Sequence, residues 1–275
     1  MIRFMSAHPL PPASLREELK STAVEAARIA GGILEEHARR GFRIEYKDAV
    51  NLVTDADRRS EQAIVDTIRK SWPDHHILAE EEGLRKGADA TYRWVIDPLD
   101  GTTNFAHGFP AYCVSIGVEY KGRCILGVVL DPVRQELFLA ESGGGASLNG
   151  MPMRVASTPS LNEALLVTGF AYDIRQSPNN NLDHFSRFAL RAQGLRRTGA
   201  AALDLSYVAA GRFDGFWELK LQPWDTAAGL VIVQEAGGRV TDFKGVPYSI
   251  YEPSIVASNG LIHDEMLEVL AANAV

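Results

Sequence analysis

Apolar residues recur at helical spacing in the first part of the chain. Between residues 14 and 39 they fall three or four positions apart, at Leu15, Leu19, Ala23, Ala26, Ala30, Ile33 and Leu34. This spacing predicts one face of a long amphipathic helix, which Gly41 should end. A second helix is expected from near Thr54 to Trp72-Pro73, because Thr54 and Asp57 have the spacing of a capping box.

From Ile77 to about Val155 the pattern is typical of strands and hairpins. Asn149-Gly150 is a favoured two-residue hairpin turn and lies between two extended segments. Alternating apolar residues precede Lys121-Gly122, and an apolar run at 125–130 follows it, which predicts another hairpin. The middle of the chain therefore predicts a sheet built largely from hairpins.

The second half alternates between helical and extended patterns. Helical patterns at 181–193, 199–211, 225–236 and 261–273 are interspersed with short extended runs at 165–168, 238–243 and 254–258. We expect a boundary near residue 156, between an N-terminal α+β half (1–155) and a C-terminal α/β half (156–275). Because no flexible linker separates them, the halves should pack tightly as one functional unit.

The composition is that of an ordinary globular protein, with 46% hydrophobic and 23% charged residues among 275. No apolar run approaches the roughly 20 residues of a membrane span, and the first residues lack the apolar core of a signal peptide. We therefore expect a soluble, cytoplasmic protein without a membrane partner. A net charge of −7 makes nucleic-acid binding unlikely. The local basic cluster of Arg187, Arg191, Arg196 and Arg197 is more typical of a solvated helix face.

The two cysteines are predicted to be reduced. If Lys121-Gly122 forms the hairpin turn, Cys124 lies opposite Glu119, several rungs from Cys113. A disulfide between the two cysteines is then geometrically unfavourable, and two buried thiols are expected.

Candidate chemistry is concentrated in residues 94–105, WVIDPLDGTTNF. The initial apolar residues indicate the end of a buried strand, and the proline and glycine that follow predict a turn. Asp97 and Asp100 should then lie at the strand's exit. If a helix begins at Gly101-Thr102-Thr103, its backbone N–H groups could bind a phosphate.

Three further acidic stretches have simple explanations when each is taken alone. Asp57 could cap a helix, and Glu80–Glu82 could be a solvated charge run, although the apolar residues 77–79 indicate that a strand ends at Glu80. Asp225, in PWDTAAG, has the context of an N-cap. Taken together, three carboxylates, Glu80, Asp97 and Asp225, lie at element ends and are the hard oxygen ligands that Mg²⁺ prefers.

A cluster of this kind outlines a site for phosphoester hydrolysis. Asp100 adds a fourth carboxylate, and the turn exposes carbonyls such as that of Leu99. Two or three divalent ions would offset the negative charge of these ligands, so an anionic substrate would not be repelled.

At this point the chain resembles the inositol monophosphatase family. DPLDGTTNF (97–105) and WDTAAGLVIVQEAGG (224–238) are similar to the two specific signatures of that family. Other matching segments follow in the same order, namely NLVTDAD (51–57), LAEEEG (78–83), GGGASLNG (143–150) and RRTGAAALDLSYVAAGRFDGFWE (196–218). The resemblance covers roughly residues 20–265 and is strongest to the bacterial and archaeal branch.

The resemblance implies a layered αβαβα sandwich of the type shared with fructose-1,6-bisphosphatase. It also implies a Mg²⁺-dependent, Li⁺-inhibited phosphatase, usually a homodimer with two or three Mg²⁺ ions per subunit. Such an enzyme hydrolyses inositol monophosphates, which are small phosphate monoesters, with a metal-activated water.

The resemblance also implies roles for individual residues. Glu80 and Asp97 would hold one metal with the Leu99 carbonyl, and Asp97, Asp100 and Asp225 a second; a weaker third ion could lie near Glu80. The catalytic set would be Thr102, Asp57, Glu80 and Asp97, in which the Thr102 hydroxyl, backed by Asp57, orients the attacking water. The implied substrate contacts are Asp100, Gly101, Thr102, Ala201, Glu218 and Asp225, with Lys47 and Glu81 behind the ligands.

Two departures and several alternatives stay open. Ala79 replaces a frequent glycine, and Ala200 replaces a common Ser or Thr, which puts some substrate contacts in doubt. Fructose-1,6-bisphosphatase, adenosine 3′,5′-bisphosphate 3′-phosphatase and histidinol-phosphatase share the metal core, and an added RNA- or transcription-associated role is a different class. A dinucleotide-binding oxidoreductase is rejected, because SGGGASLNG lacks the G-x-G-x-x-G spacing and precedes a hairpin.

Overall fold

The computed structural model describes residues 9–40, 44–46 and 52–272. The expectations for Gly41 and Lys47 fall outside these residues. No helix in the described part of the chain is long and apolar enough to cross a membrane.

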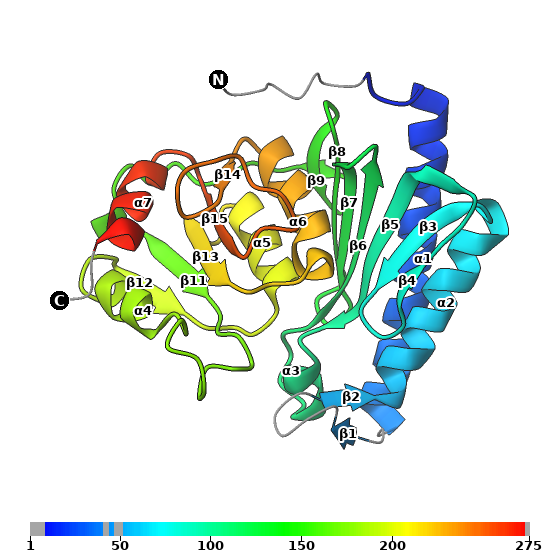
Figure 1. Ribbon diagram of the computed structural model, residues 1–275, viewed down its shortest axis with the longest axis horizontal. Helices are drawn as coiled ribbons and strands as arrows, with labels where there is room; N and C mark the ends of the chain where they lie inside the picture. The colour runs from blue at the N-terminus through cyan, green and yellow to red at the C-terminus, as the bar shows by residue number, and fades with distance from the viewer. Residues whose placement is uncertain (1–8, 41–43, 47–51, 273–275) are drawn as a thin grey trace.

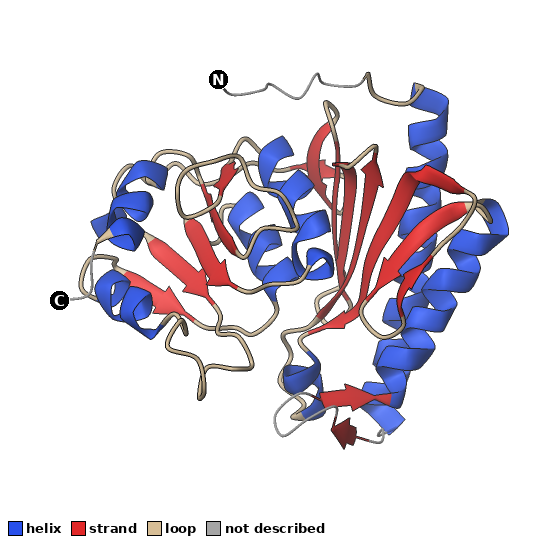
Figure 2. Ribbon diagram, viewed as in Figure 1, coloured by secondary structure: helices blue, strands red, loops and turns tan. Residues whose placement is uncertain are grey.

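Two sheets and the helices that cover them form five layers (Figures 1 and 2). The helices are α1 (Ala13–Arg40), α2 (Asp55–Ser71), α3 (Thr102–Ala106), α4 (Leu182–Ala189), α5 (Ala201–Ala209), α6 (Pro223–Glu235) and α7 (His263–Ala271). Helices α1 and α2 cover the outer face of the larger sheet, α5 and α6 lie between the sheets, and α4 and α7 cover the outer face of the smaller one. The predicted αβαβα sandwich is confirmed.

The larger sheet has eight strands in the order β10-β9-β8-β7-β6-β5-β3-β4. These strands are β3 (His75–Ala79), β4 (Gly83–Arg85), β5 (Asp89–Asp100), β6 (Cys113–Tyr120), β7 (Arg123–Asp131), β8 (Glu136–Glu141), β9 (Gly145–Leu148) and β10 (Met151–Pro152). All neighbours are antiparallel except β3 and β5, so the predicted hairpin-built sheet is correct. A separate antiparallel pair is formed by β1 (Ile44–Tyr46) and β2 (Leu52–Thr54).

The smaller sheet has the order β12-β11-β13-β15-β14 and mixes parallel with antiparallel pairs. Its strands are β11 (Leu165–Thr168), β12 (Gly194–Arg196), β13 (Gly215–Leu219), β14 (Arg239–Thr241) and β15 (Ser254–Ser258). The extended runs expected near β11, β14 and β15 are present, whereas β12 and β13 were not expected. The boundary near residue 156 stays a prediction, since α6 from the second half packs against the larger sheet.

Close packing of α6 on the larger sheet depends on two glycines. A Cβ added at Gly117 would lie 2.7 Å from the Ala227 Cβ, and one at Gly127 would lie 2.3 Å from the Ala228 carbonyl oxygen. Real Cβ atoms do not approach other atoms so closely, so only glycine allows the helix to lie this near the sheet. This packing fixes the start of α6 beside the end of β5.

Both predicted hairpin turns are confirmed. Lys121 and Gly122 have φ angles of 51° and 77°, and Asn149 and Gly150 have 50° and 80°, as two-residue turns of the I′ type require. Cys124 pairs with Glu119 as expected, and both cysteines are free, with Cys113 buried and Cys124 half-buried.

Three local expectations were wrong. Strand β5 does not end before the aspartates but continues to Asp100. Asp225 is the third residue of α6 rather than its N-cap, which is Gln222. The helical pattern at 181–193 gives a helix only as far as Ala189.

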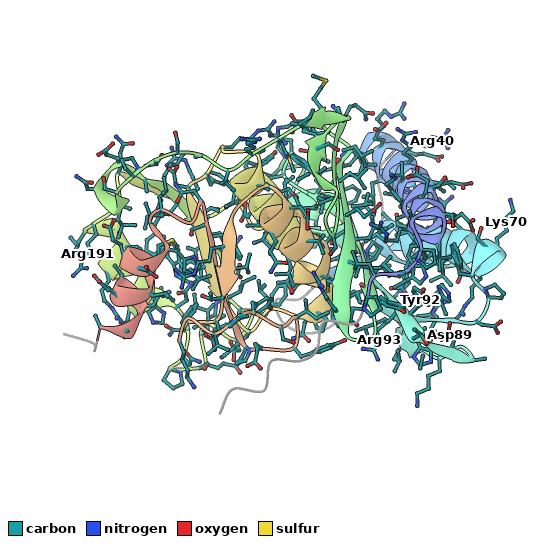
Figure 3. The ribbon with its side chains drawn as sticks, turned by 90° about the horizontal axis from the view of Figure 1, so that it is seen from above. Arg40, Lys70, Asp89, Tyr92, Arg93 and Arg191 are labelled. Atoms are coloured by element: carbon teal, nitrogen blue, oxygen red, sulfur yellow. The ribbon has the colours of Figure 1, made fainter. Side chains whose placement is uncertain are left out.

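Three of the four arginines in the basic cluster, Arg187, Arg191 and Arg197, have different surroundings in the structure. The Arg187 Nη1 donates a hydrogen bond to the Val269 carbonyl at the end of α7, and Arg197 lines a cavity. Arg191 lies at the outer end of the smaller-sheet half, away from the larger sheet (Figure 3). These three side chains therefore lie in different parts of the smaller-sheet half.

Candidate active site

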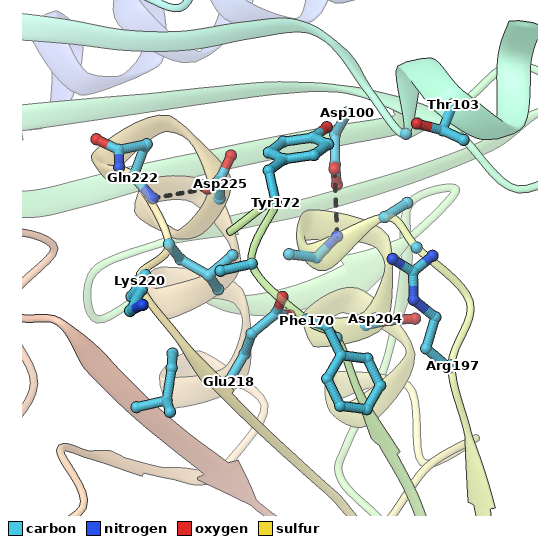
Figure 4. A pocket seen from close by; sticks show the side chains of 18 of the residues that line it. Asp100, Thr103, Phe170, Tyr172, Arg197, Asp204, Glu218, Lys220, Gln222 and Asp225 are labelled. Atoms are coloured by element: carbon cyan, nitrogen blue, oxygen red, sulfur yellow. Dashed lines mark hydrogen bonds between the residues drawn. The ribbon is translucent and has the colours of Figure 1, made fainter. Parts of the chain in front are cut away.

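A cavity of about 180 Å³ lies where the two sheets and their intervening helices meet. Its lining comes from the end of β5, the starts of α3, α5 and α6, the end of β13 and the loop after β11 (Figure 4). Because element ends leave backbone groups unpaired, this junction can present both carboxylates and N–H groups to a ligand.

A bulge in β5 places Asp97 and Asp100 at this junction. Asp97 pairs with Ser115 of β6 and Asp100 with Cys113, so two residues, Pro98 and Leu99, lie opposite one residue of β6. Such a bulge tolerates a proline, which has no N–H to donate, and redirects the strand. The Asp97 Oδ1 accepts a hydrogen bond of 3.0 Å from the Leu99 N–H.

Asp100 joins the larger sheet to α5. Its two carboxylate oxygens accept hydrogen bonds from the Ala201 N–H (3.2 Å) and the Ala202 N–H (2.7 Å) in the first turn of that helix. A negative charge is favoured there, because the unpaired N–H groups and the helix dipole both stabilise it. Ala201 therefore reaches the site through its backbone.

Asp225 and Glu80 approach from two other elements. Asp225 lies in the first turn of α6, where its carboxylate accepts a 2.7 Å hydrogen bond from the Gln222 N–H (Figure 4). Glu80 directly follows β3, as predicted. The four carboxylates are electrostatic neighbours, since Glu80, Asp100 and Asp225 all raise the pKa of Asp97.

Burial and mutual repulsion disfavour the charged forms of these groups. The pKa of Asp97 is raised well above its ordinary value, first by burial and then by the neighbouring carboxylates. Burial raises the pKa of Asp100 to about 6, against the opposing effect of the Ala202 and Ala201 N–H groups. Burial, followed by Asp100, raises the pKa of Asp225. Among the described residues, no basic side chain is one of the main electrostatic partners of these three aspartates, whose charges are offset chiefly by backbone N–H groups.

The side chains are neighbours but are not drawn together around one point. Among the described residues, no three His, Cys, Asp or Glu side chains form a ready-made ligand set. Their electrostatic coupling nevertheless places Glu80, Asp100 and Asp225 close to Asp97. The donor set, hard carboxylate oxygens with a nearby carbonyl, fits Mg²⁺.

Thr102 and Asp57 form a buried polar pair beside the carboxylates. The Thr102 Oγ1 lies 3.1 Å from the Asp57 Oδ1 and 3.1 Å from the Leu99 carbonyl oxygen. A hydroxyl has one proton to donate, so its lone pairs remain able to accept a hydrogen bond from water. Gly101 precedes α3 with a φ of +96°, and a helix does begin at Thr102 as predicted.

The opposite wall of the cavity carries a second acidic group. Glu218, on the central strand β13, is 7% exposed, and Figure 4 shows its carboxylate directed into the cavity. Burial raises the pKa of Glu218 well above its ordinary value, with a further increase from Asp204, whereas Arg197 lowers it. Glu218 and Asp100 thus reach the same cavity from different elements, whereas Asp97 lies behind its lining residues.

The structure adds lining residues that the sequence did not identify. Phe170 and Tyr172 come from the loop after β11, while Arg197 and Asp204 flank the start of α5 (Figure 4). Tyr172 is 57% exposed and lies beside Asp100 and Asp225 (Figure 4). The sequence signal for these four residues was their place along the chain, since each follows a strand or lies in the first turn of a helix at the same edge of the fold.

Comparisons with known proteins agree with this architecture. The family model described as the inositol monophosphatase family matches residues 15–275. The chain is 50% identical over 224 residues to an inositol-1-monophosphatase from Synechocystis sp., covering 82% of this chain and 78% of that protein. It is 49% identical over 249 residues to the Nus factor SuhB of Pseudomonas aeruginosa, covering 88% of this chain and 92% of that protein.

A solved structure supports the same assignment. The inositol monophosphatase from Anabaena (Nostoc) sp. superposes with a TM-score of 0.85 at 44% identity, over 92% of this chain and 95% of that one. Sequence, fold and site thus agree, and the chain belongs to the inositol monophosphatase family of phosphatases.

Proposed function

We propose that the protein is a Mg²⁺-dependent phosphatase that hydrolyses inositol monophosphates to inositol and phosphate. The observation that supports this most directly is the group of buried aspartates Asp97, Asp100 and Asp225, whose pKa values burial raises. Asp100 raises the pKa of the other two further, and none of the three has a basic side chain among its main electrostatic partners in the described part of the chain. A bound cation would stabilise the charged forms of such mutually repelling buried carboxylates. The 50% identity to an inositol-1-monophosphatase supports the substrate.

The proposed ligand set follows the sequence expectation. Glu80 and Asp97, with the Leu99 carbonyl, would hold one ion, and Asp97, Asp100 and Asp225 a second. When bound, Mg²⁺ would lower the pKa of a coordinated water and offset the charge of the phosphate. The four carboxylates would provide ligands for two ions. A third ion near Glu80 would bind with lower affinity.

The chain's own residues would position the reactants. The Thr102 hydroxyl would orient the attacking water, because its hydrogen bond to Asp57 or to the Leu99 carbonyl fixes its lone pairs. The Gly101 and Thr102 N–H groups at the start of α3 would bind phosphate oxygens. No cysteine or histidine nucleophile is needed, and water attacks phosphorus in line.

Glu218 would recognise the alcohol part of the substrate. Its carboxylate faces the same cavity from the opposite wall and could accept hydrogen bonds from polyol hydroxyls. Ala201 would border the same space. Ala200 occupies a position where the family often has Ser or Thr. It is 1% exposed, so it can offer the substrate little surface.

A substrate panel at fixed Mg²⁺ tests this proposal. Inorganic phosphate release is measured from inositol 1-phosphate, fructose 1,6-bisphosphate, adenosine 3′,5′-bisphosphate and histidinol phosphate. We expect the highest kcat/KM for inositol 1-phosphate, loss of activity with a chelator, and inhibition by Li⁺. A higher kcat/KM for one of the other substrates would overturn the inositol assignment while leaving the phosphatase in place.

A second role is suggested by the 49% identity to a protein named Nus factor. We infer that a transcription-associated function is the principal alternative to a purely metabolic one. A gel-shift assay with RNA at physiological salt separates them, and the dispersed arginines lead us to expect no shift. We also propose a cytoplasmic homodimer, which sedimentation measurements would test.

A further inference from the structure

Glu61 is a buried acidic residue that the proposed reaction does not use. It lies on α2, is 1% exposed, and its carboxylate points at the turn that joins β3 to β4. The Glu61 Oε2 accepts a hydrogen bond of 2.8 Å from the Glu81 N–H, and its Oε1 accepts one of 3.2 Å from the Glu82 N–H. The Arg85 Nη2 lies 3.2 Å from the same Oε1.

The turn held by Glu61 carries a proposed metal ligand. Ala79 pairs with Gly83 across the β3–β4 hairpin, so the turn consists of residues 80–82 and begins with Glu80. Glu61 accepts hydrogen bonds from the N–H groups of Glu81 and Glu82, which are one and two residues after Glu80. The backbone at Glu80 is therefore fixed on its C-terminal side by a side chain from a different element.

The same face of α2 also reaches the other side of the site. Asp57 lies four residues before Glu61, and residues at this spacing share a helix face. Asp57 accepts the Thr102 hydroxyl at 3.1 Å, while Glu61 holds the turn after Glu80. One rigid helix thus sets the distance between the water-orienting threonine and the β3–β4 turn.

The burial of this carboxylate has a cost that the surrounding hydrogen bonds offset. Burial raises the pKa of Glu61, while the Glu81 N–H and Arg85 lower it. Arg85 also contacts the Glu82 carboxylate at 2.8 Å, so the guanidinium links the last residue of the turn to Glu61. Charge-assisted hydrogen bonds of this kind are stronger and more directional than neutral ones.

We propose that Glu61 is a positioning residue for the metal centre, which holds the residue 80–82 turn so that Glu80 can reach a divalent ion shared with Asp97. This inference depends on the proposed function, because it takes Glu80 as a metal ligand. Partners behind metal ligands typically affect metal affinity by 10- to 100-fold when they are removed. The role of Glu61 is therefore in Mg²⁺ affinity and not in the chemical step.

Glu61→Gln is the informative substitution. It keeps the shape of the side chain, but one of its two oxygens becomes an NH₂ group, which then faces an N–H donor instead of accepting from it. One of the two hydrogen bonds to the turn is lost, and the interaction with Arg85 weakens.

Asp131→Asn is a matched control. Asp131 is also a buried carboxylate that accepts two consecutive backbone N–H groups, of Val133 (2.9 Å) and Arg134 (3.0 Å), and contacts the Arg134 guanidinium at 2.9 Å. It holds the β7–β8 turn, which does not line the cavity. The two substitutions therefore remove the same type of interaction at different places.

Three measurements on the full-length protein test the proposal. Calorimetry with Mg²⁺ alone should show affinity roughly tenfold weaker in Glu61→Gln and changed by less than about twofold in Asp131→Asn. Hydrogen exchange at the Glu81 and Glu82 amides should accelerate in Glu61→Gln only. The Mg²⁺ concentration for half-maximal activity should rise in parallel, with kcat at saturating Mg²⁺ close to that of the unsubstituted protein.

Other outcomes would overturn the positioning role. Unchanged Mg²⁺ affinity in Glu61→Gln, or an equal loss in Asp131→Asn, would show that the hydrogen bonds only stabilise the fold. An Asp97→Asn protein serves as the reference. If Asp97→Asn loses Mg²⁺ binding while Glu61→Gln keeps its full Mg²⁺ affinity, the positioning role of Glu61 is refuted and the proposed metal centre is not. Unchanged Mg²⁺ binding in Asp97→Asn would refute the proposed metal centre itself.

Discussion

Glu218 provides the sharpest test of substrate recognition, because it is separate from the proposed metal ligands. It lies on β13, where it pairs with Ile255 of β15, and the preceding residue Trp217 pairs with Thr168 of β11. Among the described residues, no hydrogen-bond donor contacts its carboxylate, and the cavity is the space it faces. A substrate hydroxyl would therefore gain a charged acceptor without displacing an internal partner.

The expected loss in Glu218→Gln follows from the strength of that interaction. A hydrogen bond to a charged group contributes about 1.5–3 kcal/mol, which corresponds to a loss of roughly tenfold or more in kcat/KM for inositol 1-phosphate. The amide keeps the shape of the side chain, so the fold should be preserved. Because burial raises the pKa of Glu218, the deficit should shrink as the pH falls and the wild-type carboxyl becomes protonated.

The assay compares two substrates and a control variant. Hydrolysis of p-nitrophenyl phosphate, which lacks the polyol hydroxyls, should barely change in Glu218→Gln. Glu119→Gln is the control, since Glu119 is another buried carboxylate, 2% exposed. Its Oε2 lies 3.2 Å from the Arg93 Nη1, and neither residue is one of the proposed catalytic residues. This substitution should leave the ratio of the two substrates unchanged.

A second substitution moves the carboxylate without removing it. A Cβ at Gly169 would lie 2.3 and 2.4 Å from the two carboxylate oxygens of Glu218. Gly169→Ala should therefore displace the carboxylate and reproduce most of the loss on inositol 1-phosphate. Equal losses on both substrates in Glu218→Gln would place the residue in the catalytic machinery, and no loss on either would refute its role in recognition.

Three further predictions concern the metal centre, the water and the pH dependence of stability. Asp97→Asn should lower kcat at least about a hundredfold with the fold intact, because metal ions supply several kcal/mol of transition-state stabilisation; near-normal turnover would exclude Asp97 as a ligand. Thr102→Ala keeps the backbone N–H, so kcat should fall strongly with a much smaller change in KM, whereas a large rise in KM at unchanged kcat would show a binding role only. His263, hydrogen-bonded at both ring nitrogens to Ser258 (2.8 Å) and Thr241 (2.9 Å), has its pKa lowered by burial to about 4. The unfolded chain protonates this group near pH 6.5, so its contribution to stability is present above that pH and decreases by up to about 3 kcal/mol as the pH falls toward 4. Denaturant unfolding of the wild type and His263→Gln at several pH values measures the difference, and equal slopes would contradict it.

The carboxylates were identifiable from the sequence because of their placement. Asp97 and Asp100 follow an apolar segment and precede turn residues, and Asp225 precedes the apolar stretch of a helix. Glu80 follows an apolar run in the same way. The layers of the fold were predicted through family resemblance, whereas the hairpins followed from turn chemistry at Lys121-Gly122 and Asn149-Gly150.

The extent of β5 was not predictable from the local pattern. Pro98 normally interrupts strand pairing, but here it lies in a bulge between two paired residues, Asp97 and Asp100. The strand therefore continues through a residue that would otherwise end it. A bulge depends on the partner strand β6, which is not visible in the sequence around Pro98.

Strand β13 was missed because it carries no alternation. All five of its residues, Gly215–Leu219, are buried, since helices cover both faces of the smaller sheet. A short strand buried on both sides cannot be distinguished by periodicity from other buried segments. Glu218 was identified only through the resemblance of residues 196–218 to the inositol monophosphatase family.

Glu61 illustrates a different limit. An acidic residue on an amphipathic helix usually faces solvent, and nothing in SEQAIV distinguishes Glu61 from its neighbour Gln62. Its role depends on the packing of α2 beside the β3–β4 turn, which only the tertiary structure shows.

The most direct test of the metal centre is anomalous diffraction from crystals soaked in Mn²⁺, which replaces Mg²⁺ at oxygen-ligand sites. The account predicts anomalous peaks between Asp97, Asp100 and Asp225 and between Glu80 and Asp97, beside the Leu99 carbonyl, and their loss in crystals of Asp97→Asn. Peaks elsewhere in the molecule with none at these carboxylates would contradict it.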